Sequence, residues 1–420
     1  KSRNHRVYLL KVEDDELGAV DLDSFQSALD LLENTNPHAV YALGYGGIAE
    51  ALPKMAFGNR IGFAIDTEAD LFASRYGSFI IESDQPLDLP LLGYTGSWQE
   101  TSINGQRIDL AALQQAWEEP LQEIFPTAGS QISNDDLRVD ESCLTKTLHA
   151  PYRKDSPQVF IPIFPGTNCE YDTARAFEEE GAITHIFVFR NETEQMIFDS
   201  IDELVELLGQ CQILAFPGGF SSGDEPDGSA KFIVNVLQNE KVKKAVHDLL
   251  DRDGLILGIC NGFQALVKSG LLPYGRIRTL DESAPTLFRN DINRHISTIV
   301  HTRVASNHSP WLAHEQVGDV YSIAVSHGEG KFVVSEELAE ELFEKGCVAF
   351  QYCDDEGRLS YDSHSNVNGS CYAIEGITSF DGHILGKMGH SERYFNDVFK
   401  NIPGKKKQSI FASGVQYFKK

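Results

Sequence analysis

A cysteine flanked by glycines is the strongest chemical signal in the chain. Residues 258–262 read G-I-C-N-G; they complete the apolar run 255–259 and lead into an amphipathic stretch that begins at Asn261. A nucleophile on a tight turn between a buried strand and a helix is lifted above the edge of the sheet, and the glycines let neighbouring backbone come close. We expect the helix N-terminus to lower the thiol pKa and favour the thiolate. The spacing therefore predicts covalent catalysis by Cys260.

A second glycine turn is expected to lie beside this cysteine. Residues 217–219 read P-G-G and follow the apolar run 213–216. Because the carboxyl ends of parallel strands meet at one edge of a sheet, this turn and the cysteine turn should lie together. We predict that the backbone amides of Gly219, Phe220 and Asn261 form an oxyanion hole.

Two histidines with a nearby carboxylate compete for the role of base. His390 is followed by Glu392, and His327 is followed by Glu329. A cysteine nucleophile needs a base within hydrogen-bonding reach and a group that orients this base. The spacing fits both pairs equally, so the residues alone leave both assignments open.

The elements around these residues predict an α/β protein. Residues 158–262 alternate short apolar runs with amphipathic stretches, which is typical of a parallel sheet covered by helices on both faces. Residues 1–127 have the pattern of an α+β unit, and residues 128–157 are polar and have the composition of a linker. We therefore expect three parts, with the chemistry confined to residues 158–420.

Composition limits the possible partners. The 420 residues include 36 Lys and Arg against 62 Asp and Glu, a formal net charge of −26, so we expect no nucleic-acid binding. No run of 18 apolar residues occurs, so we expect no membrane span. The seven cysteines include no C-x-x-C pair, which favours a reducing cytoplasm over a disulfide or zinc scaffold. The chain does not begin with Met, and we expect it to be a piece of a longer polypeptide.

The motifs together resemble a known family. Residues 260–264, C-N-G-F-Q, resemble the nucleophile motif of the triad (class I) glutamine amidotransferases. Further motifs in chain order are P-G-T-N-C-E at 165–170, P-G-G-F-S at 217–221, H-G-E-G at 327–330, N-V-N-G-S at 366–370 and H-S-E-R at 390–393. This set is similar to the glutaminase domain of the phosphoribosylformylglycinamidine synthase family, and it implies a flavodoxin-like parallel sheet covered by helices.

The resemblance implies a catalytic triad. In the family the base and its carboxylate come from the late block, which here contains His390 and Glu392, with Cys260 as the nucleophile. The family usually has proline between the last two triad members, and this chain has Ser391. Both functional side chains of the block are kept.

The resemblance also implies residues that hold glutamine. Gln264 matches a position that binds the substrate, and Gly218 belongs to the glycine loop beside it. His327 and Glu329 form a family block near the site, with no role assigned. No metal or cofactor is expected in this domain.

Residues 1–127 resemble the C-terminal half of an aminoimidazole-ribonucleotide-synthetase-like domain, through G-G-I-A-E-A-L at 46–52 and M-A-F-G-N at 55–59. The acidic metal-facing positions of that family are missing from residues 38–45, so we expect no catalysis by this half. The resemblance implies the synthetase portion of the same enzyme as a partner. There ATP and Mg²⁺ would activate formylglycinamide ribonucleotide, and ammonia from glutamine would convert it to the amidine in purine biosynthesis.

Two other classes of protein remain as alternatives. A free-standing cysteine hydrolase or peptidase could use the same turn, and it would cleave peptides or γ-glutamyl conjugates. A non-enzymatic scaffold with an idle triad would keep a reactive Cys260 without turning over glutamine.

Overall fold

The computed structural model describes residues 4–58, 60–123, 138, 148–221, 229–396 and 398–419. The chain divides into two compact units, Lys1–Thr127 with Phe399–Pro403, and Ala128–Val398 with Gly404–Lys420. Most of the predicted linker 128–157 lies outside the described residues. Residues 148–157 pack on the larger unit, since the amides of Ala150 and Lys154 donate to carbonyls of the C-terminal helix.

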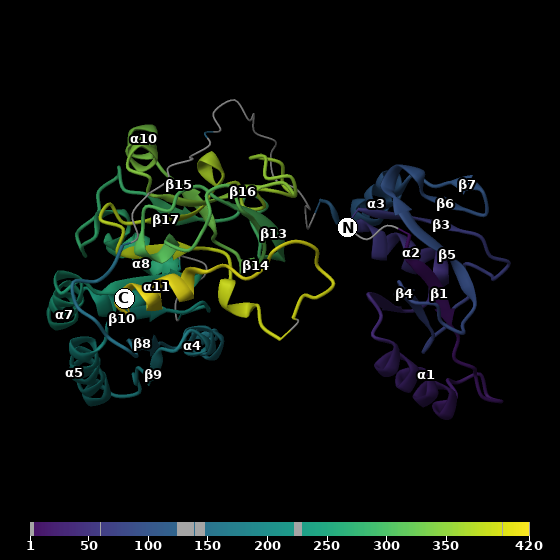
Figure 1. Ribbon diagram of the computed structural model, residues 1–420, viewed down its shortest axis with the longest axis horizontal. Helices are drawn as coiled ribbons and strands as arrows, with labels where there is room; N and C mark the ends of the chain where they lie inside the picture. The colour runs from purple at the N-terminus through teal and green to yellow at the C-terminus, as the bar shows by residue number, and fades with distance from the viewer. Residues whose placement is uncertain are drawn as a thin grey trace. The chain divides into compact units, whose positions relative to one another are not determined.

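The smaller unit is an α+β structure built on one largely antiparallel sheet (Figure 1). Its strand order is β2-β4-β1-β5-β3-β6-β7, and among these strands only β3 and β6 pair in parallel. The elements are β1 Arg6–Leu10, α1 Leu22–Thr35, β2 Ala39–Ala42, α2 Gly47–Phe57, β3 Ile61–Ile65, β4 Phe79–Ser83, β5 Leu91–Ser97, β6 Ser102–Ile103, β7 Gln106–Arg107 and α3 Leu110–Glu118. The central strands β1 and β4 are buried on both sides, with separate apolar clusters around Leu9 and around Tyr8.

The larger unit is an α/β structure on a mixed sheet of order β14-β13-β16-β17-β18-β11-β10-β8-β9 (Figure 1). Its first half, up to the cysteine turn and the helix after it, contains β8 Gln158–Ile163, α4 Glu170–Glu179, β9 Ile183–Val188, α5 Glu194–Gln210, β10 Ile213–Phe216, α6 Lys231–Leu237, α7 Glu240–Asp251, β11 Leu255–Ile259 and α8 Asn261–Ser269. Its second half contains α9 Leu271–Tyr274, β12 Thr286–Phe288, β13 Ile296–Val304, β14 Val320–His327, β15 Lys331–Val333, α10 Glu336–Glu344, β16 Val348–Cys353, β17 Ile374–Thr378, β18 Ile384–Lys387 and α11 Ile410–Lys419.

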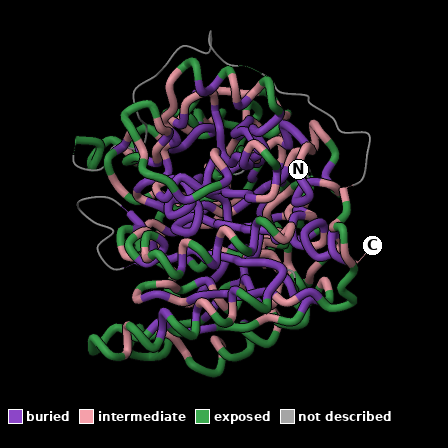
Figure 2. The backbone as a smooth tube through the Cα atoms, turned by 90° about the vertical axis from the view of Figure 1, so that its left-hand side faces the viewer, coloured by how far each residue is buried: buried purple, intermediate pink, exposed green. Residues whose placement is uncertain are grey.

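The predicted parallel sheet is present, but it is only part of the whole. Strands β9, β8, β10, β11 and β18 run parallel, whereas β17, β16, β13 and β14 extend the sheet antiparallel. Helix α4 leads from β8 out to β9 and α5 leads back to β10, so right-handed crossovers place these helices on opposite faces. Buried backbone runs between the helices, whose outer turns are exposed (Figure 2).

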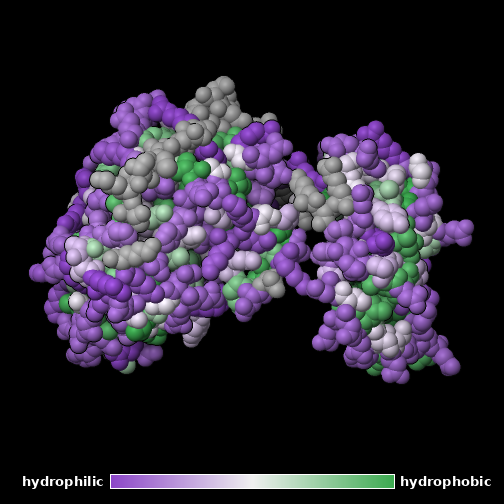
Figure 3. Space-filling view, in the orientation of Figure 1, coloured by the Kyte–Doolittle hydropathy of each residue, from purple (hydrophilic) through white to green (hydrophobic). Residues whose placement is uncertain are grey.

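The surface is rich in hydrophilic residues. Hydrophilic residues dominate the face seen in Figure 3, and the net charge is −26. Within the described ranges, no helix combines the length and the apolar character needed to cross a membrane.

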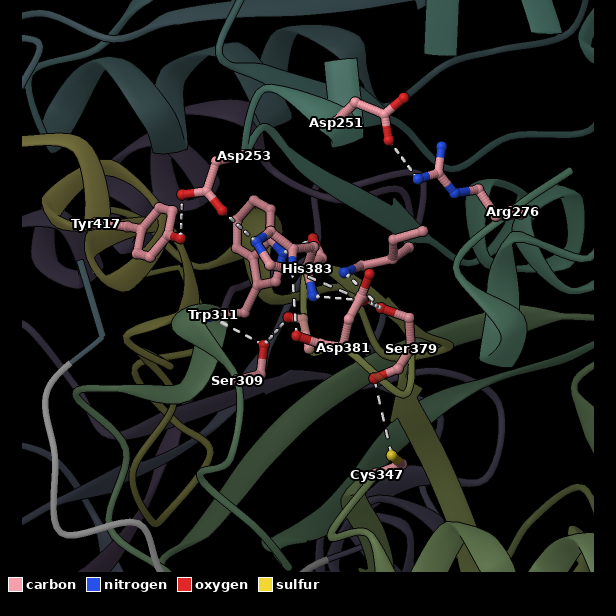
Figure 4. A network of polar contacts seen from close by, with 12 residues as sticks. Asp251, Asp253, Arg276, Ser309, Trp311, Cys347, Ser379, Asp381, His383 and Tyr417 are labelled. Carbon is pink, nitrogen blue, oxygen red and sulfur yellow. Dashed lines mark hydrogen bonds and ion pairs between the residues drawn. The ribbon is translucent and has the colours of Figure 1, made fainter. Parts of the chain in front are cut away.

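A polar network ties the amino end of β18 to the C-terminal helix (Figure 4). His383 Nε2 lies 2.9 Å from a carboxylate oxygen of Asp253, and the other oxygen of this carboxylate accepts a 2.6 Å hydrogen bond from Tyr417 in α11. The indole of Trp311 donates to the carbonyl of His383. Asp381 lies on the other side of the imidazole, 3.7 Å from Nδ1. The network fixes the edge of the sheet opposite the cysteine turn.

Candidate active site

Cys260 lies on a strained turn between β11 and α8. Its φ is +52°, a value that non-glycine residues rarely adopt and that is typical of functional turns. A Cβ on Gly262 would lie 2.1 Å from the carbonyl oxygen of Phe216, and one on Gly258 would lie 2.5 Å from Leu266. The close approach of strand and helix therefore requires both glycines, and the predicted elbow is confirmed.

The thiol pKa differs from the prediction. Burial is the largest cause of a raised pKa at Cys260, and together with the nearby Cys169 and Glu392 it brings this pKa to about 12. The expectation of a lowered pKa was therefore wrong for this structure, because loss of hydration outweighs the effect of the helix N-terminus. The Cys260 side chain donates to the carbonyl oxygen of Ser326, with a sulfur–oxygen distance of 3.6 Å.

His390 and Glu392 form a buried pair at the same edge of the sheet. They follow β18, which runs parallel to β11 and is paired with it, so His390 and Cys260 both lie beyond the carboxyl ends of neighbouring strands. Nδ1 of His390 is 2.6 Å from Oε1 of Glu392. Burial alone would raise the pKa of Glu392, but attraction to His390 outweighs it and lowers the pKa. Among the described residues, Nε2 of His390 has no hydrogen-bond partner.

Polar contacts hold the segment that contains His390 and Glu392 on both sides. Ser391, which stands where the family usually has proline, is buried and donates to the side-chain oxygen of Gln408. Arg175 of α4 donates to the carbonyl of Glu392 at 2.9 Å. These hydrogen bonds restrain the backbone at Ser391 and Glu392, as the ring of a proline at position 391 would.

Cys169 lies beside His390 of the predicted triad, and the sequence analysis assigns it no role. Its sulfur is 4.0 Å from Nδ1 of His390, and the guanidinium of Arg393 donates to it at 3.4 Å. Ligand atoms of Cys169, His390 and Glu392 lie within 4.8 Å of one another, a grouping that could hold a metal ion. The adjacent guanidinium opposes a cation, and the His390–Glu392 bond already uses two of these groups. The cluster therefore favours proton transfer over metal binding.

A small cavity opens beside Cys260, and Gln264 is fixed in its wall. The lining residues are Gly219, Phe220, Ser229, Cys260, Gln264, His327, Gly328 and Glu329. The amide nitrogen of Gln264 donates to the carbonyl of Glu329 at 2.6 Å, and its oxygen accepts from Asn261 at 2.9 Å. The cavity brings together most of the residues that the sequence predicted for glutamine binding and oxyanion stabilisation.

His327 lies in the wall of this cavity as a neutral imidazole. Burial lowers its pKa to about 3. The side-chain oxygen of Asn290 accepts from the amide of Gly330 and lies 3.0 Å from Nδ1 of His327. An oxygen cannot donate, so Nδ1 carries the proton and Nε2 is an acceptor. This Nε2 is buried, with no partner in the described part of the chain.

Glu329 is held by polar groups from two other segments. One carboxylate oxygen accepts from the amide of Ser229 at 2.8 Å and lies 3.8 Å from the ammonium of Lys268. The H-G-E-G block therefore contributes a cavity-lining histidine and a carboxylate that fixes the loop around it.

The oxyanion loop differs from the prediction in one position. The amide of Phe220 donates to the carbonyl of Gly166 at 2.9 Å, so in this structure it is engaged within the protein. The role of the backbone amides of Gly219 and Asn261 as hydrogen-bond donors to an oxyanion stays a prediction. Gly218 lies against the ring of His390, and its predicted role in glutamine binding stays a prediction.

Asn368 and Asn290, from two segments far apart in the chain, support the His327 loop. Asn368 donates to the carbonyl of Gly330 at 2.8 Å and to the hydroxyl of Tyr352 at 3.0 Å. Asn290 donates to the carbonyl of His327 at 2.8 Å. The side chains involved are buried, and they hold the loop rather than line the cavity.

Known proteins share sequence similarity with this chain. A family model described as a CobB/CobQ-like glutamine amidotransferase domain matches residues 156–418. The phosphoribosylformylglycinamidine synthase subunit PurQ of Rhodopseudomonas palustris strain HaA2 is 34% identical over 259 residues, 62% of this chain and 97% of the relative. The subunit of the same name from Bradyrhizobium diazoefficiens is 32% identical over 260 residues, with the same coverage. The solved PurLQS structure from Thermotoga maritima is 24% identical, with 62% of this chain and 99% of that chain covered and a TM-score of 0.45.

Proposed function

Because the chain belongs to the CobB/CobQ-like glutamine amidotransferase family, we propose that residues 158–420 hydrolyse glutamine to glutamate and ammonia with Cys260 as the nucleophile. Its PurQ relatives indicate the use of this ammonia, which is the conversion of formylglycinamide ribonucleotide to formylglycinamidine ribonucleotide in purine biosynthesis. The observation that carries the proposal is the strained Cys260 turn, at the same sheet edge as the buried His390–Glu392 pair.

Attack on glutamine begins with a proton transfer. The Cys260 thiol gives its proton to Nε2 of His390, and the sulfur forms a bond to the side-chain carbonyl carbon of glutamine. Glu392 accepts a hydrogen bond from Nδ1–H of His390, which fixes the tautomer and stabilises the imidazolium. The amides of Gly219 and Asn261 receive the oxyanion of the tetrahedral intermediate.

Collapse of the intermediate releases ammonia. The carbon–nitrogen bond breaks while Nε2–H of His390 protonates the leaving nitrogen, and a γ-glutamyl thioester remains on Cys260. His390 then removes a proton from water, which attacks the thioester carbonyl. Glutamate leaves, and the proton returns to the thiolate sulfur.

His327 supplies an acceptor for the substrate. Its Nε2 lone pair lines the same cavity as Cys260 and Gln264, and the low pKa keeps it neutral at physiological pH. An N–H group of the bound glutamine is the donor that matches this acceptor. We assign His327 to glutamine binding on this basis, and Glu329 to support of the His327 loop.

The synthetase portion of the enzyme is the proposed partner. There ATP and Mg²⁺ activate the formyl amide oxygen of formylglycinamide ribonucleotide, and ammonia replaces it, which makes the whole enzyme an ATP-dependent ligase of the cytoplasm. No residue of 158–420 is assigned to ATP or Mg²⁺. Residues 1–127 are proposed to be half of a synthetase-like domain without catalytic residues of its own.

A glutaminase assay of Cys260→Ala tests the proposal. Glutamate release should be measured with the synthetase portion, ATP and formylglycinamide ribonucleotide present, because coupling between the two sites can silence a glutaminase by itself. Loss of the nucleophile should lower kcat by about 1,000-fold or more. Glutamate release at the rate of the unchanged chain would contradict the assignment.

The matched control is Cys371→Ala, a half-buried cysteine outside the cavity, which should keep full activity. Two results would favour the alternative classes. Cleavage of peptides by the unchanged chain, with no labelling of Cys260 by a glutamine-analogue electrophile, indicates a peptidase. Labelling of Cys260 without any turnover of glutamine indicates an idle triad.

A further inference from the structure

Lys387 and Glu375 form an ion pair with no exposure to solvent. The ammonium nitrogen lies 3.2 Å from Oε1 of the carboxylate, and both side chains have 0% relative exposure. Lysine is almost never fully buried without a partner, and removing two charges from water is costly even when they are paired. Apolar side chains of similar volume would often be no less stable at such a site. Packing alone therefore does not explain why this ion pair is buried.

The pair binds both polar backbone groups of Gly389, the residue before His390. The ammonium of Lys387 donates to the carbonyl of Gly389 at 2.9 Å. The amide of Gly389 donates to Oε1 of Glu375 at 2.5 Å. A Cβ on Gly389 would lie 2.8 Å from that same oxygen and 3.0 Å from the ammonium, so the side chains close directly around the backbone.

Lys387 also holds the nucleophile, through its backbone. Its carbonyl accepts from the amide of Cys260 at 2.8 Å, where β18 lies beside β11. The amide of His390 in turn donates to the carbonyl of Ala324 at 2.8 Å. Lys387 therefore holds Cys260 through its backbone carbonyl, and it holds Gly389, the residue before His390, through its side chain.

A contact with an aromatic ring also holds the Lys387–Glu375 pair. The ammonium lies 5.2 Å from the ring centroid of Phe350, within the range of a cation–π contact. Oε2 of Glu375 has no hydrogen-bond partner among the described residues. All the described polar contacts of this carboxylate therefore go through the oxygen that binds Lys387 and Gly389.

We propose that the Lys387–Glu375 pair is a positioning device for the triad, which fixes the turn at Met388 and Gly389 and so sets His390 relative to Cys260. This inference rests on the proposed glutaminase function. Neither charged group lines the cavity, so both are positioning residues rather than catalytic ones. Loss of the pair should therefore affect the chemical step and leave glutamine binding unchanged.

The main test is the double variant Lys387→Met with Glu375→Gln in the complete enzyme. It removes both charges at nearly constant volume, so no unpaired charge is left in the interior. We expect kcat for glutamate release to fall by about 10- to 100-fold, because a small misplacement of a catalytic group has an effect of this size. The KM for glutamine should stay within about twofold, and the acid limb of the pH profile of kcat should shift.

A second pair of variants separates positioning from folding. Glu375→Gln keeps an oxygen that can accept from Gly389 and Lys387, whereas Glu375→Leu does not. Rates should be expressed per site that a glutamine-analogue electrophile can label, which removes any loss of folded protein. Per labelled site, Glu375→Gln should retain several-fold more kcat than Glu375→Leu. The control is Lys244→Met with Asp248→Asn, an exposed pair on α7, which should change nothing.

The outcomes are distinguishable from failure of the proposed function. If the double variant and Glu375→Leu keep the kcat of the unchanged enzyme per labelled site, the positioning role is wrong and the glutaminase assignment stands. Equal kcat losses in Glu375→Gln and Glu375→Leu would also overturn it. If Cys260→Ala releases glutamate normally, the proposed function fails, whatever the pair does.

Discussion

Gly218 lies directly against the imidazole of His390. A Cβ at Gly218 would be 2.7 Å from Cε1 of the ring and 3.2 Å from the sulfur of Cys169. Real Cβ atoms do not approach other atoms so closely, so any side chain here must displace the ring. The glycine loop after β10 therefore helps to set the place of the proposed base.

Gly218→Ala should lower the glutaminase kcat by about 10- to 100-fold, because the added Cβ displaces the imidazole of His390, the proposed base. The KM for glutamine should change less, and the fold should persist. Steady-state kinetics and thermal unfolding check both statements. Gly209→Ala is the control, since an added Cβ in this turn of α5 meets no atom within 4 Å. Equal activity in the two variants would show that Gly218 does not position the base.

The reactivity of Cys260 should follow its raised pKa. With a thiol pKa of about 12, the thiolate fraction grows about tenfold with each pH unit between pH 7 and 10. The rate of carboxamidomethylation at Cys260, followed by peptide mass mapping in the absence of glutamine, should rise with that slope. A plateau below pH 9 would mean that the thiolate is already stabilised at rest, as the helix N-terminus alone would suggest.

Much of the site could be predicted, because it depends on local patterns. The strands Leu255–Ile259 and Ile213–Phe216 have the bounds that their apolar runs indicate, and each ends in a glycine turn. Neighbouring parallel strands then bring these turns together. The family motif distinguishes His390 from His327, whereas spacing does not, since both histidines are buried and each is followed two residues later by a buried glutamate.

The remaining features depend on contacts between distant residues. The antiparallel half of the sheet forms by long-range pairing that apolar runs do not specify. Lysine is usually an exposed residue. Nothing in the sequence around Lys387 indicates that this side chain is buried and paired with Glu375. The pKa of Cys260 is set by how deeply the turn is buried, and the contact of Cys169 with His390 joins two motifs far apart in the chain.

His327→Leu should weaken glutamine binding. It removes the Nε2 acceptor and leaves a donor of the substrate without a partner, an effect of about 1–3 kcal/mol. The KM for glutamine should rise by about 10- to 100-fold, with kcat changed less than about threefold. His364→Leu, an exposed histidine of the same unit, is the control. A loss in kcat with unchanged KM would instead make His327 part of the chemical step.

The His383 network should make the larger unit less stable at high pH. Burial alone would lower the pKa of His383, but its hydrogen bonds to Asp381 and Asp253 outweigh burial and raise the pKa to about 9, against 6.5 for the unfolded chain. The folded state then binds the extra proton, so the stabilisation is complete below pH 6.5 and is lost as the pH rises through 9. The loss in the free energy of unfolding should be on the order of 3 kcal/mol.

The pH dependence of stability that comes from Asp381 of the same network has the opposite sign (Figure 4). Burial would raise the pKa of this carboxyl, but its bonds to His383 and Ser379 lower it to about 2. Its contribution is present above the unfolded pKa of about 3.8 and is lost as the pH falls through about 2. The network is therefore most stabilising at pH values between about 4 and 6.5.

Trp311 can report this dependence, because its indole donates to the carbonyl of His383. Replacing Trp98 and Trp117 of the smaller unit by phenylalanine leaves Trp311 as the single tryptophan of the chain. Urea unfolding of this variant, followed by fluorescence from pH 6 to 10, should show the decline. Adding His383→Gln should flatten the curve between pH 7 and 9. The same slope with and without His383 would mean that another group controls the stability of the larger unit in this range.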